Sequence, residues 1–227
     1  ERAEEAFSCA SIAGQLNYLQ GHSRPGVTLA ASQVARLAHS PKRSHELALA
    51  EIGRYLKGTA GKGLILKPGF GRSGVLKADV LADASFASGW GAELPTSPGS
   101  AKPRAGFIIE VAGCPALWAS KLQPAIAAST MEAEYAALPM ALRPAIPLLG
   151  LAQAAADGLA AFGERVLPFQ SAAHGGSQGA LALAEPPAGR GTPRPKLYAL
   201  KLHWLRPWLE PKKAELKCIK PAEQKAG

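Results

Sequence analysis

The sequence predicts an α+β protein in which helices flank a mixed β-sheet and a small helical segment comes first. Two observations support this prediction. Apolar residues recur at helical spacing from residue 8 to about residue 60, whereas from residue 63 they form short runs bounded by Gly and Pro, as strands do. The later strand candidates alternate with helical segments, which favours a mixed sheet with helices packed against it.

Residues 1–62 are predicted to form a separate unit of three helices. Leu16 and Leu19 share one face of the first helix, and a basic last turn with a glycine cap closes the third. Pro41 ends the second helix. Residues 63–227 are expected to form the second domain.

The second domain contains six candidate strands and one long Ala-rich helix. The strand candidates are residues 63–66, 75–82, 106–111, 116–120, 165–169 and 216–219. Shorter helices are expected at residues 178–184 and 197–209. The long helix, residues 129–162, contains Pro139, Pro144 and Pro147, each of which costs about 3 kcal/mol inside a helix. We therefore expect a kink or a break in this helix.

Composition limits where the protein acts. No apolar run reaches the roughly 20 residues that span a bilayer, and residues 1–5 do not resemble a secretory signal. Cys9, Cys114 and Cys218 are odd in number and far apart, which fits neither a disulfide framework nor a zinc site. We expect no membrane partner and an intracellular location, cytoplasmic or nuclear.

The charge predicts a polyanionic partner. The net charge is +9, and residues 190–227 hold ten Lys or Arg against three Glu. A solvated basic terminus is the alternative interpretation. The candidate nucleic-acid contacts are Arg194, Lys196, Lys201, Lys212 and Lys213.

A series of motifs, matched in order, resembles the Pol polyproteins of copia-type (LTR) retrotransposons. Residues 15–19, 23–26, 31–36, 39–41 and 54–59 resemble the connection segment that follows the reverse transcriptase core. Residues 83–87, 106–107, 118–124 and 129–138 resemble the ribonuclease H domain of the same polyprotein. The resemblance implies a ribonuclease H-like five-stranded mixed sheet with flanking helices. It also implies two partners, an RNA/DNA hybrid and the reverse transcriptase core of the parent polyprotein.

The resemblance further implies an active site of four acids around two Mg²⁺ ions. Asp83 matches the first acid. Glu132 matches the second, because it is the first acid after the Ser/Thr pair, from which only Met131 separates it. Glu134 is the second choice for that ligand. Without the resemblance, Asp83 reads as a turn acid and Glu132 as a first-turn acid favoured by the helix dipole.

Two acids of the family pattern are absent from the matching positions. Gly176 stands where the third acid is expected, and residues 223–227 do not supply the fourth. His174 lies close to Gly176 and could replace a ligand, although a surface-loop histidine is the alternative.

The missing acids predict an impaired enzyme. Two-ion hydrolysis needs cations about 3.5–4 Å apart, and few carboxylates hold Mg²⁺ weakly. With Asp83 and Glu132 as the remaining ligands, we expect a degenerate ribonuclease H-like module that still binds RNA/DNA hybrid, with at most one weak Mg²⁺ site. Two alternatives stay open. One is a non-catalytic basic scaffold or nucleic-acid-binding protein in a larger assembly, and the other is an active hybrid ribonuclease completed by residues outside this chain.

Overall fold

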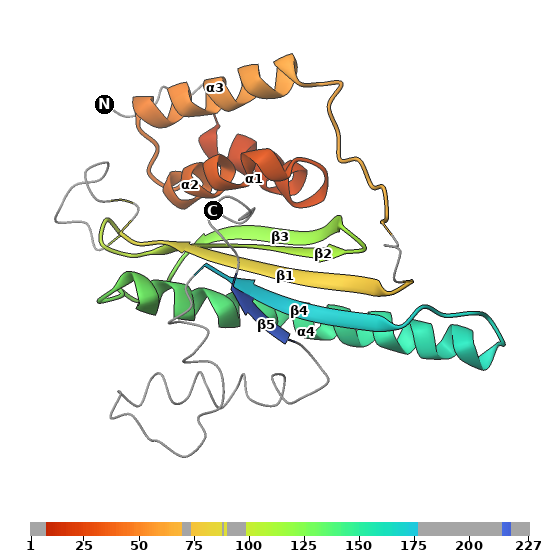
Figure 1. The fold of residues 1–227 in the computed structure, drawn as a ribbon. Helices are drawn as coiled ribbons and strands as arrows, with labels where there is room; N and C mark the ends of the chain where they lie inside the picture. The colour runs from red at the N-terminus through yellow and green to blue at the C-terminus, as the bar shows by residue number, and fades with distance from the viewer. Residues whose placement is uncertain (1–7, 70–73, 88, 90–98, 177–214, 219–227) are drawn as a thin grey trace. The chain divides into compact units, whose positions relative to one another are not determined.

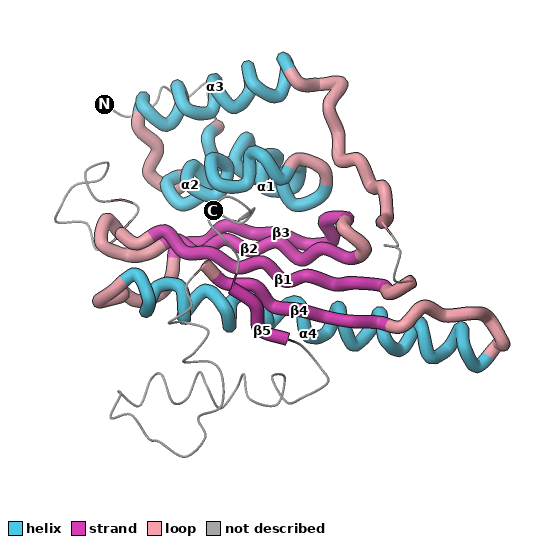
Figure 2. Tube along the Cα trace, viewed as in Figure 1, coloured by secondary structure: helices cyan, strands magenta, loops and turns pink. Residues whose placement is uncertain are grey.

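The chain divides into two compact units. A computed structural model describes residues 8–69, 74–87, 89, 99–176 and 215–218. One unit comprises residues 1–66 together with 118–121, and the other comprises residues 67–117 together with 122–227. Helices dominate the described N-terminal stretch, and a sheet forms the centre of the second unit (Figures 1 and 2).

The N-terminal stretch is helical, as the sequence predicts. It forms α1 (Cys9–His22), a short 3-10 helix η1 (Pro25–Val27), α2 (Thr28–Leu37) and α3 (Arg43–Gly58). The hydroxyl of Ser8 accepts a hydrogen bond from the N–H of Ser11 at 3.3 Å and so caps the start of α1.

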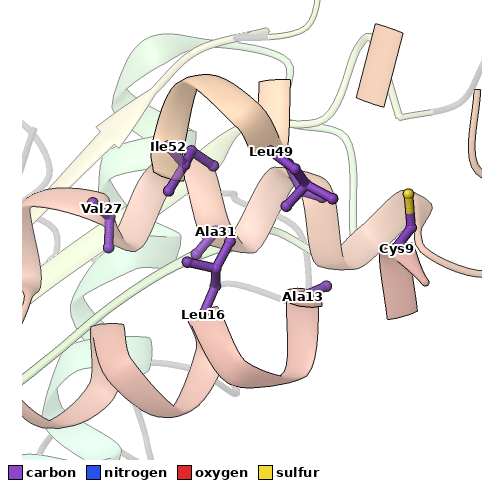
Figure 3. Packing of buried hydrophobic residues seen from close by; sticks show 8 residues of the cluster. Cys9, Ala13, Leu16, Val27, Ala31, Leu49 and Ile52 are labelled. Carbon is purple, nitrogen blue, oxygen red and sulfur yellow. The ribbon is translucent and has the colours of Figure 1, made fainter. Parts of the chain in front are cut away.

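The three helices of this unit bury one apolar cluster. Its members are Cys9, Ala13, Leu16, Val27, Ala31, Val34, Leu49 and Ile52. Figure 3 shows Leu16, Ala31 and Ile52 on three different helices, directed into the space between them. Apolar residues three or four apart lie on one face of a helix. The same spacing that predicted the helices therefore builds the core of the unit.

The second unit is built on a five-stranded mixed sheet. Its strands are β1 (Leu76–Ser85), β2 (Arg104–Val111), β3 (Cys114–Leu122), β4 (Phe169–Gly175) and β5 (Glu215–Cys218). They lie in the order β3-β2-β1-β4-β5. β1 is antiparallel to β2 and parallel to β4, and β4 is parallel to β5. This arrangement confirms the predicted α+β class.

Two of the predicted strands are wrong. Residues 63–66 form no strand, and Ile65 keeps 84% of its surface exposed, so this apolar run is not buried in a sheet. The strand predicted at residues 165–169 lies instead at Phe169–Gly175. Ala172 and Gly175 have weak strand propensity, so burial and pairing with β1 define this strand and local preference does not.

One long helix, α4 (Thr130–Ala161), packs against β1 and β2. The predicted break is wrong, because Pro139, Pro144 and Pro147 all lie inside one continuous helix, and the predicted kink stays a prediction. Figure 1 shows α4 along one face of the sheet. Its buried side chains are Ala133, Tyr135, Ala137, Leu138, Ala141, Leu142, Ala145 and Leu149. The free energy gained by burying this apolar face offsets the cost of the backbone hydrogen bonds that the prolines remove. By length and hydropathy α4 also meets the criteria for a membrane span, but core helices of soluble proteins meet them too.

Two leucines of α4 test this packing. Leu138 is 2% exposed and Leu151 is 68% exposed. Leu138→Ala should lower the free energy of unfolding by about 2–5 kcal/mol, because it leaves a cavity beneath the sheet. Leu151→Ala should change it by less than about 0.5 kcal/mol. Urea unfolding of both variants measures the difference, and equal losses would contradict the described packing.

Candidate carboxylate site

Asp83 lies at the place where β1 extends beyond its neighbour β4. On one side it pairs with Gly106 of β2. On the other side the pairing with β4 ends one residue earlier, where Ala82 lies opposite Gly175. The backbone of β1 therefore continues past the end of β4 at Asp83. We call the space beside Asp83, past the end of β4, the opening. A side chain from a neighbouring element can enter it.

The start of α4 is fixed by a pair of capping contacts. The hydroxyl of Ser129 accepts a hydrogen bond from the N–H of Glu132 at 3.2 Å. Oε2 of Glu132 in turn accepts one from the N–H of Ala128 at 2.7 Å. Such reciprocal contacts satisfy N–H groups that a helix start leaves without partners. The carboxylate of Glu132 thus stabilises the helix terminus.

Glu134, and not Glu132, meets Asp83. The Glu134 carboxyl group is hydrogen-bonded to the Asp83 side chain and to the backbone of Ala84 and Gly176. Burial, then the negative charge of Asp83, then the hydrogen bond with Asp83 raise the pKa of Glu134 to about 8. The backbone hydrogen bonds lower this pKa and only partly offset the rise. At neutral pH, Glu134 is therefore mostly protonated and shares its proton with Asp83.

Gly176 stands against both carboxyl groups. A Cβ atom added at this position would lie 3.2 Å from Oδ1 of Asp83 and 3.2 Å from Oε1 of Glu134. The backbone thus comes close enough for a side chain at position 176 to join the pair. The residue that the chain has there offers no side-chain oxygen.

The structure and the sequence motif favour different glutamates as the partner of Asp83. The family motif favours Glu132 over Glu134 as the ligand beside Asp83, whereas the structure brings Glu134, and not Glu132, to Asp83. The metal-ligand roles of Asp83 and Glu132 stay predictions. The remaining candidate contacts, Arg194, Lys196, Lys201, Lys212 and Lys213, lie outside the described residues.

A signal for Glu134 was present in the helical pattern. Leu138 and Ala141 follow it at intervals of four and seven residues, and both are buried in the face that packs on the sheet. Arg143, eleven residues after Glu132, is exposed. The helical period therefore directs Glu134 inward and Glu132 outward, which the family motif alone does not show.

His174 forms a second polar pair on the sheet. It lies in β4, so the surface-loop interpretation is wrong. Its Nε2 is 2.7 Å from Oδ1 of Asp79. This hydrogen bond, together with the charges of His174, Lys77 and Lys217, holds the pKa of Asp79 below its ordinary value despite the opposing effect of burial. The imidazole is thus engaged by Asp79 and braces β4 against β1.

The described residues do not fit a two-Mg²⁺ centre. Within the part of the chain that the structure describes, no group of three or more His, Cys, Asp or Glu is arranged to hold a metal ion. Asp83 and Glu134 supply two carboxyl groups at this site. Mg²⁺ requires near-octahedral oxygen ligation.

The shared proton makes a pH-dependence prediction. The folded state binds the Glu134 proton more tightly than the unfolded chain, because the pKa rises from 4.5 to about 8. The resulting stability is fully present below about pH 4.5 and is lost as the pH rises through about 8. Glu134→Gln should flatten this loss, as measured by thermal unfolding between about pH 5 and pH 8.

Glu132→Gln is the matched control for this experiment. It weakens the helix cap, so it should lower the melting temperature by a similar amount at each pH and leave the slope unchanged. An identical pH profile for the unmodified chain and Glu134→Gln would contradict the shared proton.

Comparison with known proteins identifies related sequences, although no family model matches the chain. It is 32% identical over 124 residues to the retrovirus-related Pol polyprotein from transposon RE1 of Arabidopsis thaliana, covering 55% of this chain and 8% of that protein. It is 31% identical over 136 residues to secreted RxLR effector protein 161 of Plasmopara viticola, covering 60% of this chain and 87% of that one. The chain thus spans less than a tenth of the Pol polyproteins that it matches.

One solved structure has a fold similar to that of this chain. The foamy viral protease-reverse transcriptase, solved in complex with dsDNA, has a TM-score of 0.53 at 15% identity, over 97% of this chain and 39% of that chain. An N-terminal RNase H domain from Mycobacterium tuberculosis, solved as a fusion with maltose binding protein, has a TM-score of 0.40 at 12% identity, over 66% of this chain and 86% of that one. Over about 55% of its length, the chain is thus homologous to a part of the retrovirus-related Pol polyproteins of copia-type transposons, and its fold is similar to that of the foamy viral protein.

Proposed function

We propose that this chain is a ribonuclease H-like module that binds RNA/DNA hybrid and has lost the ability to cut it. One observation carries the proposal: Gly176 lies against Asp83 and Glu134, at the position where the family pattern has a third acid. The backbone there is placed for a ligand, and the ligand side chain is missing.

The chemistry of the remaining pair supports impaired cleavage. Two-ion hydrolysis of a phosphodiester requires two cations about 3.5–4 Å apart, and bridging carboxylates must offset their mutual repulsion. Asp83 and Glu134 are the two carboxyl groups that the structure brings together, and among the described residues no third His, Cys, Asp or Glu joins them as a possible metal ligand. Such a pair can hold one Mg²⁺ weakly and does not support two.

Residues from outside the chain would not repair this site completely. A partner that supplied the fourth acid would still face Gly176, which has no side-chain oxygen beside Asp83 and Glu134. The alternative of an active ribonuclease completed elsewhere therefore has less support than loss of cleavage.

The net charge and the structural similarity to a DNA-bound protein support retained binding of RNA/DNA hybrid. The net charge of +9 favours a polyanion, and the structurally similar foamy viral protein was solved with dsDNA. We further propose the reverse transcriptase core of the parent polyprotein as a partner. An intracellular location, cytoplasmic or nuclear, is proposed because Cys9, Cys114 and Cys218 are all free thiols.

Restoring a carboxylate at position 176 tests the loss of the metal site. The unmodified chain should show no Mg²⁺-dependent cleavage of the RNA strand in a hybrid and little thermal stabilisation by Mg²⁺. Gly176→Asp should unfold at a lower temperature in EDTA, because it adds a like charge to the pair. Mg²⁺ should reverse this loss, by about 1.4 kcal/mol at ten times its Kd.

Gly176→Ala is the control for crowding. It introduces the same Cβ atom without the carboxylate, so it should lose stability without responding to Mg²⁺. Mg²⁺-dependent cleavage by the unmodified chain that Asp83→Asn abolishes would refute the proposed loss of activity.

Salt dependence tests retained binding through the C-terminal basic segment. The affinity for hybrid should fall steeply with salt, because bound phosphates release counterions. Lys212→Gln with Lys213→Gln should reduce the slope of log K against log salt by about 0.9 for each phosphate that the variant no longer neutralises. Lys62→Gln with Lys67→Gln removes the same charge and should leave the slope close to that of the unmodified chain. A flat salt response would favour a protein-binding scaffold instead.

A further inference from the structure

Gln123 is a polar residue buried in the sheet unit, directly after β3. Only 3% of its surface is exposed. Its backbone N–H donates a hydrogen bond to the carbonyl oxygen of Pro103 at 2.8 Å. Pro103 directly precedes β2 and is itself fully buried. The backbone of Gln123 is therefore fixed to the start of the neighbouring strand.

The side chain of Gln123 reaches the first turn of α4. Its Nε2 donates a hydrogen bond to the carbonyl oxygen of Ala133 at 2.8 Å. Ala133 is 0% exposed and directly precedes Glu134. A buried amide costs free energy unless it is hydrogen-bonded, so this contact is strongly favoured once the side chain is buried. Gln123 thus connects the ends of two strands to the helical residue next to Glu134.

The capping contacts at the start of α4 fix its local shape and not its position against β1. Those of Ser129 and Glu132 join residues of the same helix terminus. Burial of Leu138 and its apolar neighbours holds the helix on the sheet, but hydrophobic attraction has no direction. A hydrogen bond requires a narrow range of distance and angle. The contact from Gln123 can therefore fix the rotation of the first turn and its position along the sheet.

The position of this turn determines what the Glu134 carboxyl group can reach. Its three partners are the Asp83 side chain and the backbone of Ala84 and Gly176. These partners lie near the ends of β1 and β4. All three hydrogen bonds involve one carboxyl group, so a shift of the first turn would weaken them together.

We propose that Gln123 is a positioning residue, which holds Glu134 against Asp83 and Gly176 by fixing the carbonyl group of Ala133. It acts through the backbone of α4, one residue before Glu134. The inference goes beyond the proposed function, because it concerns how the chain keeps its two carboxyl groups together. It depends neither on hybrid binding nor on the loss of cleavage.

Three variants of the full chain provide the test. Gln123→Met removes the amide group and keeps a side chain of similar length. Gln153→Met is the matched control, because Nε2 of Gln153 also donates a hydrogen bond of 2.8 Å, to Oδ1 of Asp157 farther along α4. Leu149→Ala is the control for a general loss of stability, because Leu149 is buried about four turns after Glu134.

Amide hydrogen exchange, measured by NMR, gives a local readout. The N–H groups of Ala84 and Gly176 are hydrogen-bonded to the Glu134 carboxyl group. In Gln123→Met their exchange should become faster by roughly tenfold relative to that of Ile109, which lies in the β1–β2 ladder. Both control variants should keep the ratio of the unmodified chain, because a general loss of stability speeds the exchange of all these groups.

A double-mutant cycle measures the contact between the two carboxyl groups directly. Asp83→Asn, Glu134→Gln and the double variant are compared by urea unfolding. Residues in contact change the unfolding equilibrium constant by more than about twofold beyond the product of their single effects. This coupling should be present in the unmodified chain and in both control backgrounds. It should be lost in the Gln123→Met background.

The outcomes separate this inference from the proposed function. If Gln123→Met keeps both the coupling and the exchange ratio of the unmodified chain, Gln123 only stabilises the fold and the inference is overturned. If the unmodified chain shows no coupling, the carboxyl pair itself is refuted and the inference fails with it. Mg²⁺-dependent cleavage by the unmodified chain would refute the proposed function and leave the role of Gln123 standing. If Gln123→Met does not fold, Gln123→Asn gives the same comparison, because its amide is one methylene short of Ala133.

Discussion

The site depends on the position where β1 extends beyond the end of β4. Pairing between these parallel strands ends at Ala82 and Gly175, so Asp83 continues past the end of β4. Glu134 enters this opening from α4, and its carboxyl group reaches the backbone of Ala84 and Gly176. Two acids therefore occupy one small, partly buried space. Their charges cannot both persist there without a cation or a proton.

The raised pKa of Glu134 reflects this constraint. Backbone N–H groups partly offset the cost of burying Glu134, but its pKa still rises to about 8. Earlier along the same strands, the contact of 2.7 Å between His174 and Asp79 joins β4 to β1. The sheet scaffold around the opening is thus well connected, although the carboxylate set is incomplete at Gly176. On our proposal, the chain keeps the fold and loses cleavage through the missing side-chain oxygen at Gly176.

The helical unit and the sheet unit contribute different things to the proposed binding. The sheet unit holds the carboxylates, which repel phosphate, so the attraction must come from elsewhere in the chain. Residues 1–66 hold eight Lys or Arg against five Glu, a surplus of three positive charges. On our proposal, long-range attraction comes mainly from the basic C-terminal segment, residues 190–227, which holds ten Lys or Arg against three Glu.

Local pattern determined the helices of the first unit, the class of the sheet and the absence of an acid at position 176, because each follows from residue type and short-range spacing. Tertiary structure decided the rest. Burial against the sheet carries α4 through three prolines and defines β4 despite its alanines and glycine. Packing also selects Glu134 over Glu132, since only the inward side of the helix reaches Asp83. Side-chain direction depends on the partner element, and no single stretch of sequence contains it.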